Sequence, residues 1–257
     1  MIEVLERGWR VFATGVSFTL FGVGGLLLGV FVFPLMSLAL RGRERRSAMA
    51  RTVIRFAFRF FVETMRTLGV LRYRLRGLER LEREGMLILA NHPTLIDTVF
   101  LMAFVKRADC IVKGALWNNF FLGRVVRSAG YINNDQGAQL VESCIASLRA
   151  GNNLIIFPEG TRTPAGGALA FRRGAANIAV RGARPITPAV IRCEPPTLGK
   201  DGSWWRVPPR RVMFSIDVHE DIESHQFHGA GDSDVMAARH LTQQLQDYFT
   251  KESQHHA

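Results

Sequence analysis

The chain has 257 residues, enough for one large domain with its own core, so a second full domain is not expected. Lys and Arg number 33 against 22 Asp and Glu, which gives a formal net charge of +11 at pH 7. No recognition motif and no interleaved aromatic residues accompany the arginines, so we expect no nucleic-acid partner. The three cysteines, widely spaced and odd in number, predict buried thiols in a reducing compartment.

The N-terminal part contains a long apolar stretch, residues 11–40, without a single charged residue. As a helix it would measure about 45 Å, against about 30 Å for the hydrocarbon core of a bilayer. We therefore expect a membrane-embedded helical segment. A single tilted span is one arrangement. Because Gly22, Gly24, Gly25 and Pro34 interrupt the stretch, two shorter helices dipping into one leaflet are the other. We do not expect a signal peptide, because the apolar run is too long and no small-residue cleavage signature follows it.

Arginines follow the apolar stretch at positions 41, 43, 45, 46, 51 and 55. Such clusters mark the cytoplasmic side of a membrane and favour anionic headgroups. Residues 47–68 predict an amphipathic helix lying along the headgroups. We accordingly divide the chain into a membrane-embedded and amphipathic helical region, residues 1–68, and an α/β domain, residues 69–257.

The α/β domain is predicted from strands that alternate with helices. We expect strands at 72–76 (a short edge strand), 86–90, 110–112, 130–132, 154–157, 186–191 and 212–218. We expect helices at 95–105, 120–127, 136–150, 172–181 and 232–249, and a long surface loop at 194–209. This order indicates an α/β fold with a mostly parallel central sheet covered by helices.

The first chemical signal is the pair His92 and Asp97, which follows the predicted strand 86–90. Open α/β sheets place ligands at the carboxyl ends of their strands. A histidine can accept a proton near neutral pH, and a nearby carboxylate can hold its tautomer. The two side chains can meet only if His92 lies in the turn and Asp97 in the first helical turn. Thr94 and Asp97 also fit a capping box with Thr94 as the N-cap, and the two interpretations are compatible.

A second polar turn, Phe-Pro-Glu-Gly-Thr-Arg at 157–162, follows another predicted strand. Glu159 and Arg162 offer an acceptor and a fixed cation for a polar headgroup, although a surface turn with a chance salt bridge explains them equally well in isolation. Arg172 and Arg173 are candidate contacts for donor or acceptor phosphates, or simply the solvated start of a helix. The histidines lack ligand spacing, so we expect no metal.

Together these stretches resemble the 1-acylglycerol-3-phosphate acyltransferase family, the PlsC-like lysophospholipid acyltransferases. The resemblance covers about residues 70–195 and rests on Asn91, His92 and Asp97, and on the blocks 157–164, 171–175 and 186–191. It implies transfer of a fatty acyl group from acyl-CoA or an acyl carrier protein to a hydroxyl of a lysophospholipid or related lipid, without a cofactor. Its catalytic pair corresponds to His92 and Asp97. Its acceptor-binding block corresponds to Glu159, Gly160, Thr161 and Arg162.

The resemblance also implies a mechanism and a place in the cell. His92, oriented by Asp97, would take the acceptor proton without an acyl-enzyme, which contributes about 10²–10⁴-fold. The partners would be membrane lipids and an acyl thioester donor. An acidic acyl carrier protein is one candidate for the carrier of that donor. The site would face the cytoplasm at the inner membrane. A serine hydrolase would need Gly-x-Ser-x-Gly, which is absent from the sequence; a non-catalytic lipid-binding protein stays an alternative.

One departure from the family concerns its second block, which usually ends in an arginine linked to the acceptor phosphate. Here Gln136 or a neighbour takes that place. The loss of a phosphate-pairing cation favours an acceptor without that phosphate, such as another lyso-lipid, an ornithine-type lipid or a polyene lipid. Thr94, where the family often has serine, keeps the hydroxyl.

Overall fold

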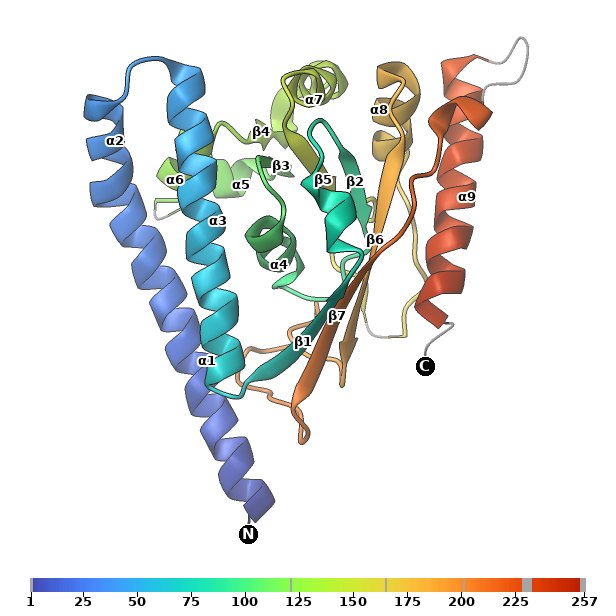
Figure 1. The fold of residues 1–257 in the computed structure, drawn as a ribbon. Coiled ribbons are helices and arrows are strands. Elements are labelled where there is room, and N and C mark those ends of the chain that lie inside the picture. Colours follow the sequence, from blue (N-terminus) through green and yellow to red (C-terminus); the bar gives the residue numbers. More distant parts are fainter. Residues whose placement is uncertain (1, 121, 165, 201, 228–232, 255–257) are drawn as a thin grey trace.

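The computed structural model describes residues 2–120, 122–164, 166–200, 202–227 and 233–254. Within these ranges seven strands form one sheet in the order β1-β7-β6-β2-β5-β3-β4 (Figure 1). The strands are β1 (Leu71–Arg76), β2 (Leu87–Ala90), β3 (Ala108–Val112), β4 (Ile132–Asn133), β5 (Asn153–Ile156), β6 (Ile186–Glu194) and β7 (Val212–Val218). The predicted strands are confirmed, with shifted ends, and β1 lies at the sheet edge as expected.

The sheet is mostly parallel, as predicted, with one reversal. Strand β2 pairs in parallel with β5 and β6, β3 pairs in parallel with β5 and β4, and β1 pairs in parallel with β7. Strands β6 and β7 are antiparallel. No crossover helix separates them in the described part of the chain, so β7 returns beside β6 in the opposite direction. The carboxyl ends of β2 and β5 therefore meet at one edge of the sheet.

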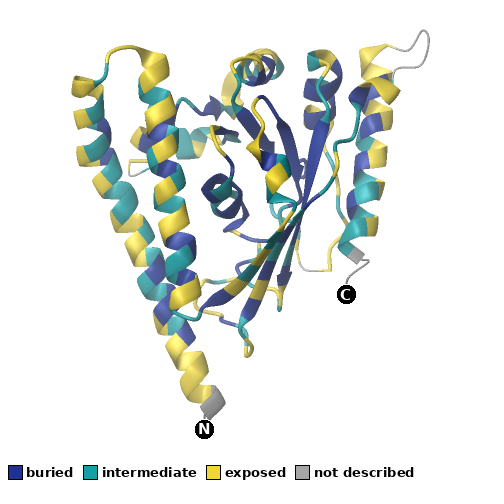
Figure 2. Cartoon of the chain, in the orientation of Figure 1, coloured by how far each residue is buried: buried dark blue, intermediate teal, exposed yellow. Residues whose placement is uncertain are grey.

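Helices cover both faces of the central strands. On one face lie α7 (Gln139–Arg149), α8 (Gly174–Gly182) and α9 (Asp234–Gln254), and on the other α4 (Asp97–Phe104) with the N-terminal helices (Figure 1). All four residues of β2 are buried, and they alternate between two cores: Leu87 and Leu89 face α7 to α9, whereas Ile88 and Ala90 face the other side. Figure 2 shows this buried centre in dark blue.

Several helix boundaries differ from the prediction. The helix predicted at 120–127 is α6 (Gly123–Ala129), with shifted ends, and the short helix α5 (Gly114–Trp117) before it was not predicted. The helix predicted from residue 136 begins only at Gln139, because Gly137 has a φ of 57°. The last helix extends to Gln254, and its predicted first residue, Asp232, lies outside the described residues.

The N-terminal apolar stretch is one continuous helical run, Val4–Ala39, and not two separate helices. It consists of α1 (Ile2–Leu27), a π-helical stretch (Leu28–Val32) and α2 (Phe33–Ala39). Pro34 lacks an N–H and crowds the preceding turn. It is the second residue after the wider π-helical stretch, which relieves this conflict. The run is long and apolar enough to cross a membrane by length and composition.

Helix α3 (Arg43–Thr67) turns back after Gly42 and runs beside α1 (Figure 1). It begins four residues earlier than predicted. The two helices pack through aromatic rings: the centroid of Phe21 lies 4.9 Å from that of Phe61 and 5.7 Å from that of Phe58. The other side of α3 docks on the sheet, where Arg51 forms an ion pair with Asp109 of β3. Thus α3 joins the N-terminal helix to the α/β domain.

Candidate active site

His92 and Asp97 are in direct contact. Strand β2 ends at Ala90, and His92 lies in the turn that follows it. Nδ1 of His92 lies 2.7 Å from Oδ2 of Asp97. The Asp97 side chain is fully buried, whereas the His92 side chain is 18% exposed. Since a carboxylate oxygen only accepts, Nδ1 carries the proton, and Nε2 is left as the nitrogen that can receive another.

Thr94 supplies two further donors to Asp97. Its backbone N–H donates to Oδ2 over 2.7 Å, and its hydroxyl donates to Oδ1. Helix α4 begins at Asp97 itself with Ile96 in the N-cap position, so the predicted register of the capping box is wrong although the carboxylate does reach back to Thr94. Burial raises the pKa of Asp97, while the bonds from His92 and Thr94 lower it again. These donors offset the cost of a buried charge.

The second predicted turn holds the backbone of His92. The His92 N–H donates to Oε1 of Glu159 over 2.9 Å, and the His92 carbonyl accepts from the Thr163 N–H over 2.9 Å. The Phe157 ring stacks on the imidazole, with centroids 4.3 Å apart. Two strand ends that are 66 residues apart in sequence, Ala90 and Ile156, thus form a single site.

Glu159 faces the catalytic turn and is buried. Glu159 is 6% exposed, and its second carboxylate oxygen, Oε2, has no hydrogen-bond partner among the described residues. Burial raises the pKa of Glu159, and the bond from the His92 N–H lowers it. The carboxylate therefore positions His92; its role in binding an acceptor stays a prediction.

The remaining predicted binding residues lie in this turn or just before α8, and all but the half-buried Arg162 are exposed. Gly160 and Thr161 are exposed, and Gly160 has a φ of 69°, which favours glycine. Arg172 is exposed and packs so closely on Gly160 that a Cβ there would lie 3.1 Å from its Nε. Arg162 donates from Nη1 to the carbonyls of Leu198 (3.2 Å) and Gly199 (2.8 Å). Arg173 is exposed at the N-cap of α8.

Sequence reasoning gave no structural role to three contributors, of which only Asn91 had been named, for the family resemblance. The amide of Asn91 exchanges two hydrogen bonds with the Ile191 backbone, of 2.8 and 2.7 Å, and so locks β2 to β6 beside the site. The carbonyl of Leu198 accepts from the Leu95 N–H over 2.9 Å, which ties the long loop to the catalytic turn. Lys113 is exposed directly after β3, at the same sheet edge. Only strand order, which a single sequence does not contain, places these groups together.

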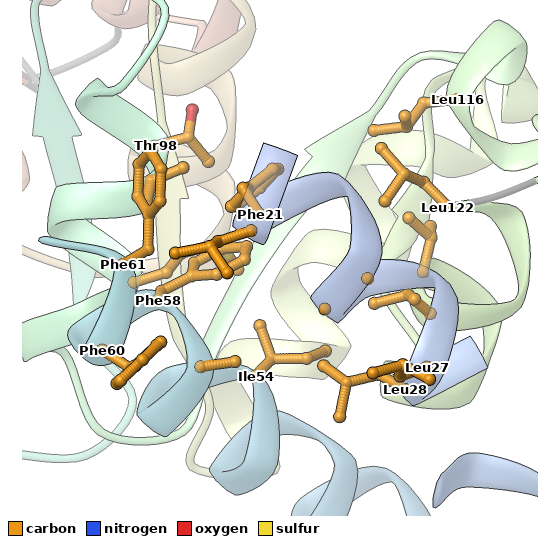
Figure 3. Close-up of a pocket in the computed structure, with 18 of the residues that line it drawn as sticks. Phe21, Leu27, Leu28, Ile54, Phe58, Phe60, Phe61, Thr98, Leu116 and Leu122 are labelled. Atoms are coloured by element: carbon orange, nitrogen blue, oxygen red, sulfur yellow. The ribbon is translucent and has the colours of Figure 1, made fainter. Parts of the chain in front are cut away.

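Next to the catalytic turn lies an apolar cavity of about 400 Å³ between α1, α3, α4 and α6. Figure 3 shows Phe21, Phe58 and Phe61 on one side and Leu116 and Leu122 on the other. Thr98, the residue after Asp97, also lines it. Its walls are aliphatic and aromatic almost throughout, so it suits a hydrocarbon chain.

The fold and the site define an α/β protein whose sheet edge carries an oriented histidine–aspartate pair, an arrangement suited to general-base chemistry. Residues 72–192 match the family model described as "Acyltransferase". The match covers 121 of the 257 residues, and over that stretch the chain is similar to this acyltransferase family.

The chain is also similar to curated relatives and to one solved structure. The chain is 31% identical over 147 residues to a 1-acyl-sn-glycerol-3-phosphate acyltransferase of Pseudomonas aeruginosa, a match that covers 55% of this chain and 57% of the relative. It is 30% identical over 139 residues to the beta enzyme of Homo sapiens, covering 51% and 50%. The crystal structure of the acyltransferase PlsC from Thermotoga maritima superposes with a TM-score of 0.65 over 96% of this chain and 98% of that one, at 19% identity, and so shares the fold. The matches span about half the length of the curated relatives.

Proposed function

We propose that this protein transfers a fatty acyl group from an acyl thioester to the free hydroxyl of a 1-acylglycerol-3-phosphate. The bond between Nδ1 of His92 and Asp97 at the carboxyl edge of the sheet is the observation that carries the proposal. The acceptor is taken from the names of the relatives, which are 1-acyl-sn-glycerol-3-phosphate acyltransferases.

The mechanism follows from the orientation of His92. Nε2 accepts the proton of the acceptor hydroxyl as its oxygen attacks the thioester carbonyl. The C–S bond of the resulting tetrahedral species then breaks, and the thiolate takes the proton back from His92. Asp97 stabilises the imidazolium formed in between, as buried carboxylates do in other histidine pairs. No covalent acyl-enzyme is required.

Cations at the same sheet edge would bind the acceptor phosphate. Arg172 and Lys113 are exposed there, and Arg162 holds the turn between them. Gln136 lies at the end of a short 3₁₀ turn and accepts a hydrogen bond from Ser143 over 2.6 Å. Gln136 stands where the family has an arginine, but Arg172 and Lys113 supply other cations. This supports a phosphate-bearing acceptor over an ornithine-type or polyene lipid.

The acyl chain would lie in the apolar cavity, where each buried CH₂ contributes about 0.8 kcal/mol. The helical run Val4–Ala39 supports membrane embedding, because its most apolar window has a mean hydropathy of 2.2 and is only 17% buried. The arginines that follow favour the cytoplasmic face of the inner membrane. The thioester donor would be acyl-CoA or an acidic acyl carrier protein, which the net charge of +11 suits.

Lipid analysis tests the proposal. Membranes with the wild-type protein should convert a labelled 1-acylglycerol-3-phosphate and an acyl thioester to phosphatidic acid, as measured by mass spectrometry. His92→Ala should lower the rate by about 10²–10⁴-fold, because the general base is lost. His225→Ala is the matched control, since His225 is exposed and follows Ile222, which bridges to Ile186 at the amino end of β6, the sheet edge opposite the site. Phosphatidic acid formation at a near-normal rate by His92→Ala would remove the catalytic hypothesis.

If phosphatidic acid does not form but a different acylated lipid accumulates, the acceptor assignment is wrong and the Gln136 departure explains it. If neither forms and lipid binding persists, the non-catalytic alternative is correct.

A further inference from the structure

A segment outside the catalytic residues carries an unusual surface. Residues 202–211, which we call the Trp–Arg loop, form the part of the β6–β7 connection that leads into β7, and they include Trp204, Trp205, Arg206, Arg210 and Arg211. From residue 202 to residue 216 the sequence has three arginines and no acidic residue. The proposed chemistry makes no use of these side chains.

The two tryptophans of the loop are exposed. Trp204 is 44% and Trp205 56% accessible, and their rings meet edge to face with centroids 5.6 Å apart. Arg206 and Arg210 are exposed beside them. Val207, in contrast, is buried and anchors the loop. The exposed aromatic and cationic groups are thus held outward by a fixed backbone.

The loop lies against the apolar helix α1. Arg10 of α1, itself only 6% exposed, donates from Nη2 to the carbonyl of Pro209. The Trp204 ring packs on Gly15 of α1 so closely that a Cβ there would come within 3.3 Å. The same part of α1 exposes two large rings, those of Trp9 (52%) and Phe12 (62%). The loop therefore continues the exposed apolar surface of α1 and adds positive charge to it.

The part of the β6–β7 connection that precedes the Trp–Arg loop is bonded to the catalytic turns. Leu198 accepts from the Leu95 N–H and from Arg162, and Gly199 accepts from Arg162. These hydrogen bonds therefore connect the β6–β7 connection to the turn that holds His92. Tryptophan rings favour the boundary between headgroups and acyl chains, and arginines pair with phosphate.

We propose that the Trp–Arg loop is a second membrane-binding element that inserts its tryptophans at the surface of an anionic leaflet and fixes the acceptor-binding turn at that surface. The inference rests on the proposed membrane location, and it is independent of the proposed chemistry. The partner is a lipid surface with anionic headgroups, because exposed rings and arginines adjoin an apolar helix and no acidic side chain opposes them within residues 202–211.

Quenching by brominated lipids tests the proposal on the full chain in nanodiscs. One variant keeps only Trp205 (Trp9→Phe, Trp117→Phe, Trp204→Phe), and a second keeps only Trp9. Both should be quenched in discs that contain phosphatidylglycerol. Adding Arg206→Ser and Arg210→Ser should reduce the quenching of Trp205 at least twofold and leave that of Trp9 unchanged.

The matched control is Arg149→Ser with Arg239→Ser, which removes two exposed arginines from α7 and α9 on the far face and should change neither signal. Quenching of Trp9 without quenching of Trp205 overturns the proposal, as does quenching of Trp205 that the loop arginines do not affect. Failure of both probes removes the membrane location as well. Shielding of Trp205 by acyl carrier protein, with no response to brominated lipid, would assign the loop to a protein partner instead.

Discussion

Two carboxylates hold His92. Asp97 contacts its imidazole ring, and Glu159 accepts from its backbone N–H. The two carboxylates are both buried, but their tasks differ. Asp97 meets an ionisable partner and so acts on the protonation of the site. Glu159 meets a backbone N–H, so it acts on the position of the ring. Substitutions separate these tasks.

Asp97→Asn should abolish most of the catalysis while leaving the fold intact. An amide cannot accept from His92 and from both donors of Thr94, so the tautomer with a free Nε2 is no longer favoured. We expect kcat to fall by about 10²–10⁴-fold with little change in KM for the acceptor. Steady-state kinetics with a labelled thioester measure both. A kcat within a few fold of wild type would show that Asp97 does not orient the base.

Glu159→Gln should keep activity and change the pH dependence of stability. The glutamine oxygen can still accept from the His92 N–H. Because burial raises the folded-state pKa of Glu159 above the unfolded value, the folded protein binds the proton more tightly. The wild type therefore loses stability as the pH rises from about 4 through the folded-state pKa, and the glutamine variant does not. Urea denaturation at pH 4 and pH 7 should show the variant gaining relative to wild type at the higher pH.

Glu159→Ala is the companion variant, since it leaves the buried His92 N–H without an acceptor. We expect a loss of about 1–3 kcal/mol in unfolding free energy and a fall in kcat. If the alanine variant matched the glutamine variant in both, the proposed backbone contact would not matter.

At the scale of whole elements, one buried ion pair docks α3 on the sheet. Nη2 of Arg51 lies 3.1 Å from Oδ2 of Asp109, and their side chains are 9% and 1% exposed. Ser147 also donates to this carboxylate. Asp109→Ala should cost about 3–5 kcal/mol in unfolding free energy, because Arg51 keeps a buried, unpaired charge.

An exposed ion pair provides the control for Asp109. Arg181 and Glu142 have side chains that are 43% and 60% exposed, so Glu142→Ala should cost less than about 1 kcal/mol. The double change Arg51→Met with Asp109→Leu should recover most of the loss by removing both charges. Denaturation midpoints that are equal for Asp109→Ala and Glu142→Ala would contradict the docking role.

The elements also show how far the sequence could be interpreted. Apolar runs such as Leu87–Ala90 predicted the strands, because a strand buried on both faces consists almost entirely of apolar residues. The polar residues after two of these strands predicted the site. The reversal at β7 and the partner of Glu159 were not predictable, since both depend on which strands become neighbours. The π-helical stretch before Pro34 was not predicted, because a proline can mark either the end of a helix or a locally widened helical turn.

For the molecule as a whole, the apolar cavity lies where the N-terminal helices meet the α/β domain. Phe21 and Phe61 come from the first region, and Val112 and Leu122 come from the second. Neither region could enclose the cavity alone. The length of the acyl chain that the cavity would hold therefore depends on how the two regions pack. A side chain added on α1 therefore tests the role of the cavity without touching the catalytic turn.

Gly24→Leu should shift the enzyme toward shorter acyl donors. Gly24 lines the cavity, and a Cβ there meets no atom within 4 Å, so the new side chain can enter the space. If two methylenes of a long donor no longer fit, about 1.6 kcal/mol is lost, which lowers kcat/KM roughly tenfold for that donor. Gly22→Leu is the matched control, because Gly22 also has open space around it but is exposed on the outer side of α1. A competition assay with donors of graded length should show the shift in Gly24→Leu alone. The same shift in both variants would trace it to the outer side of α1 and not to the cavity.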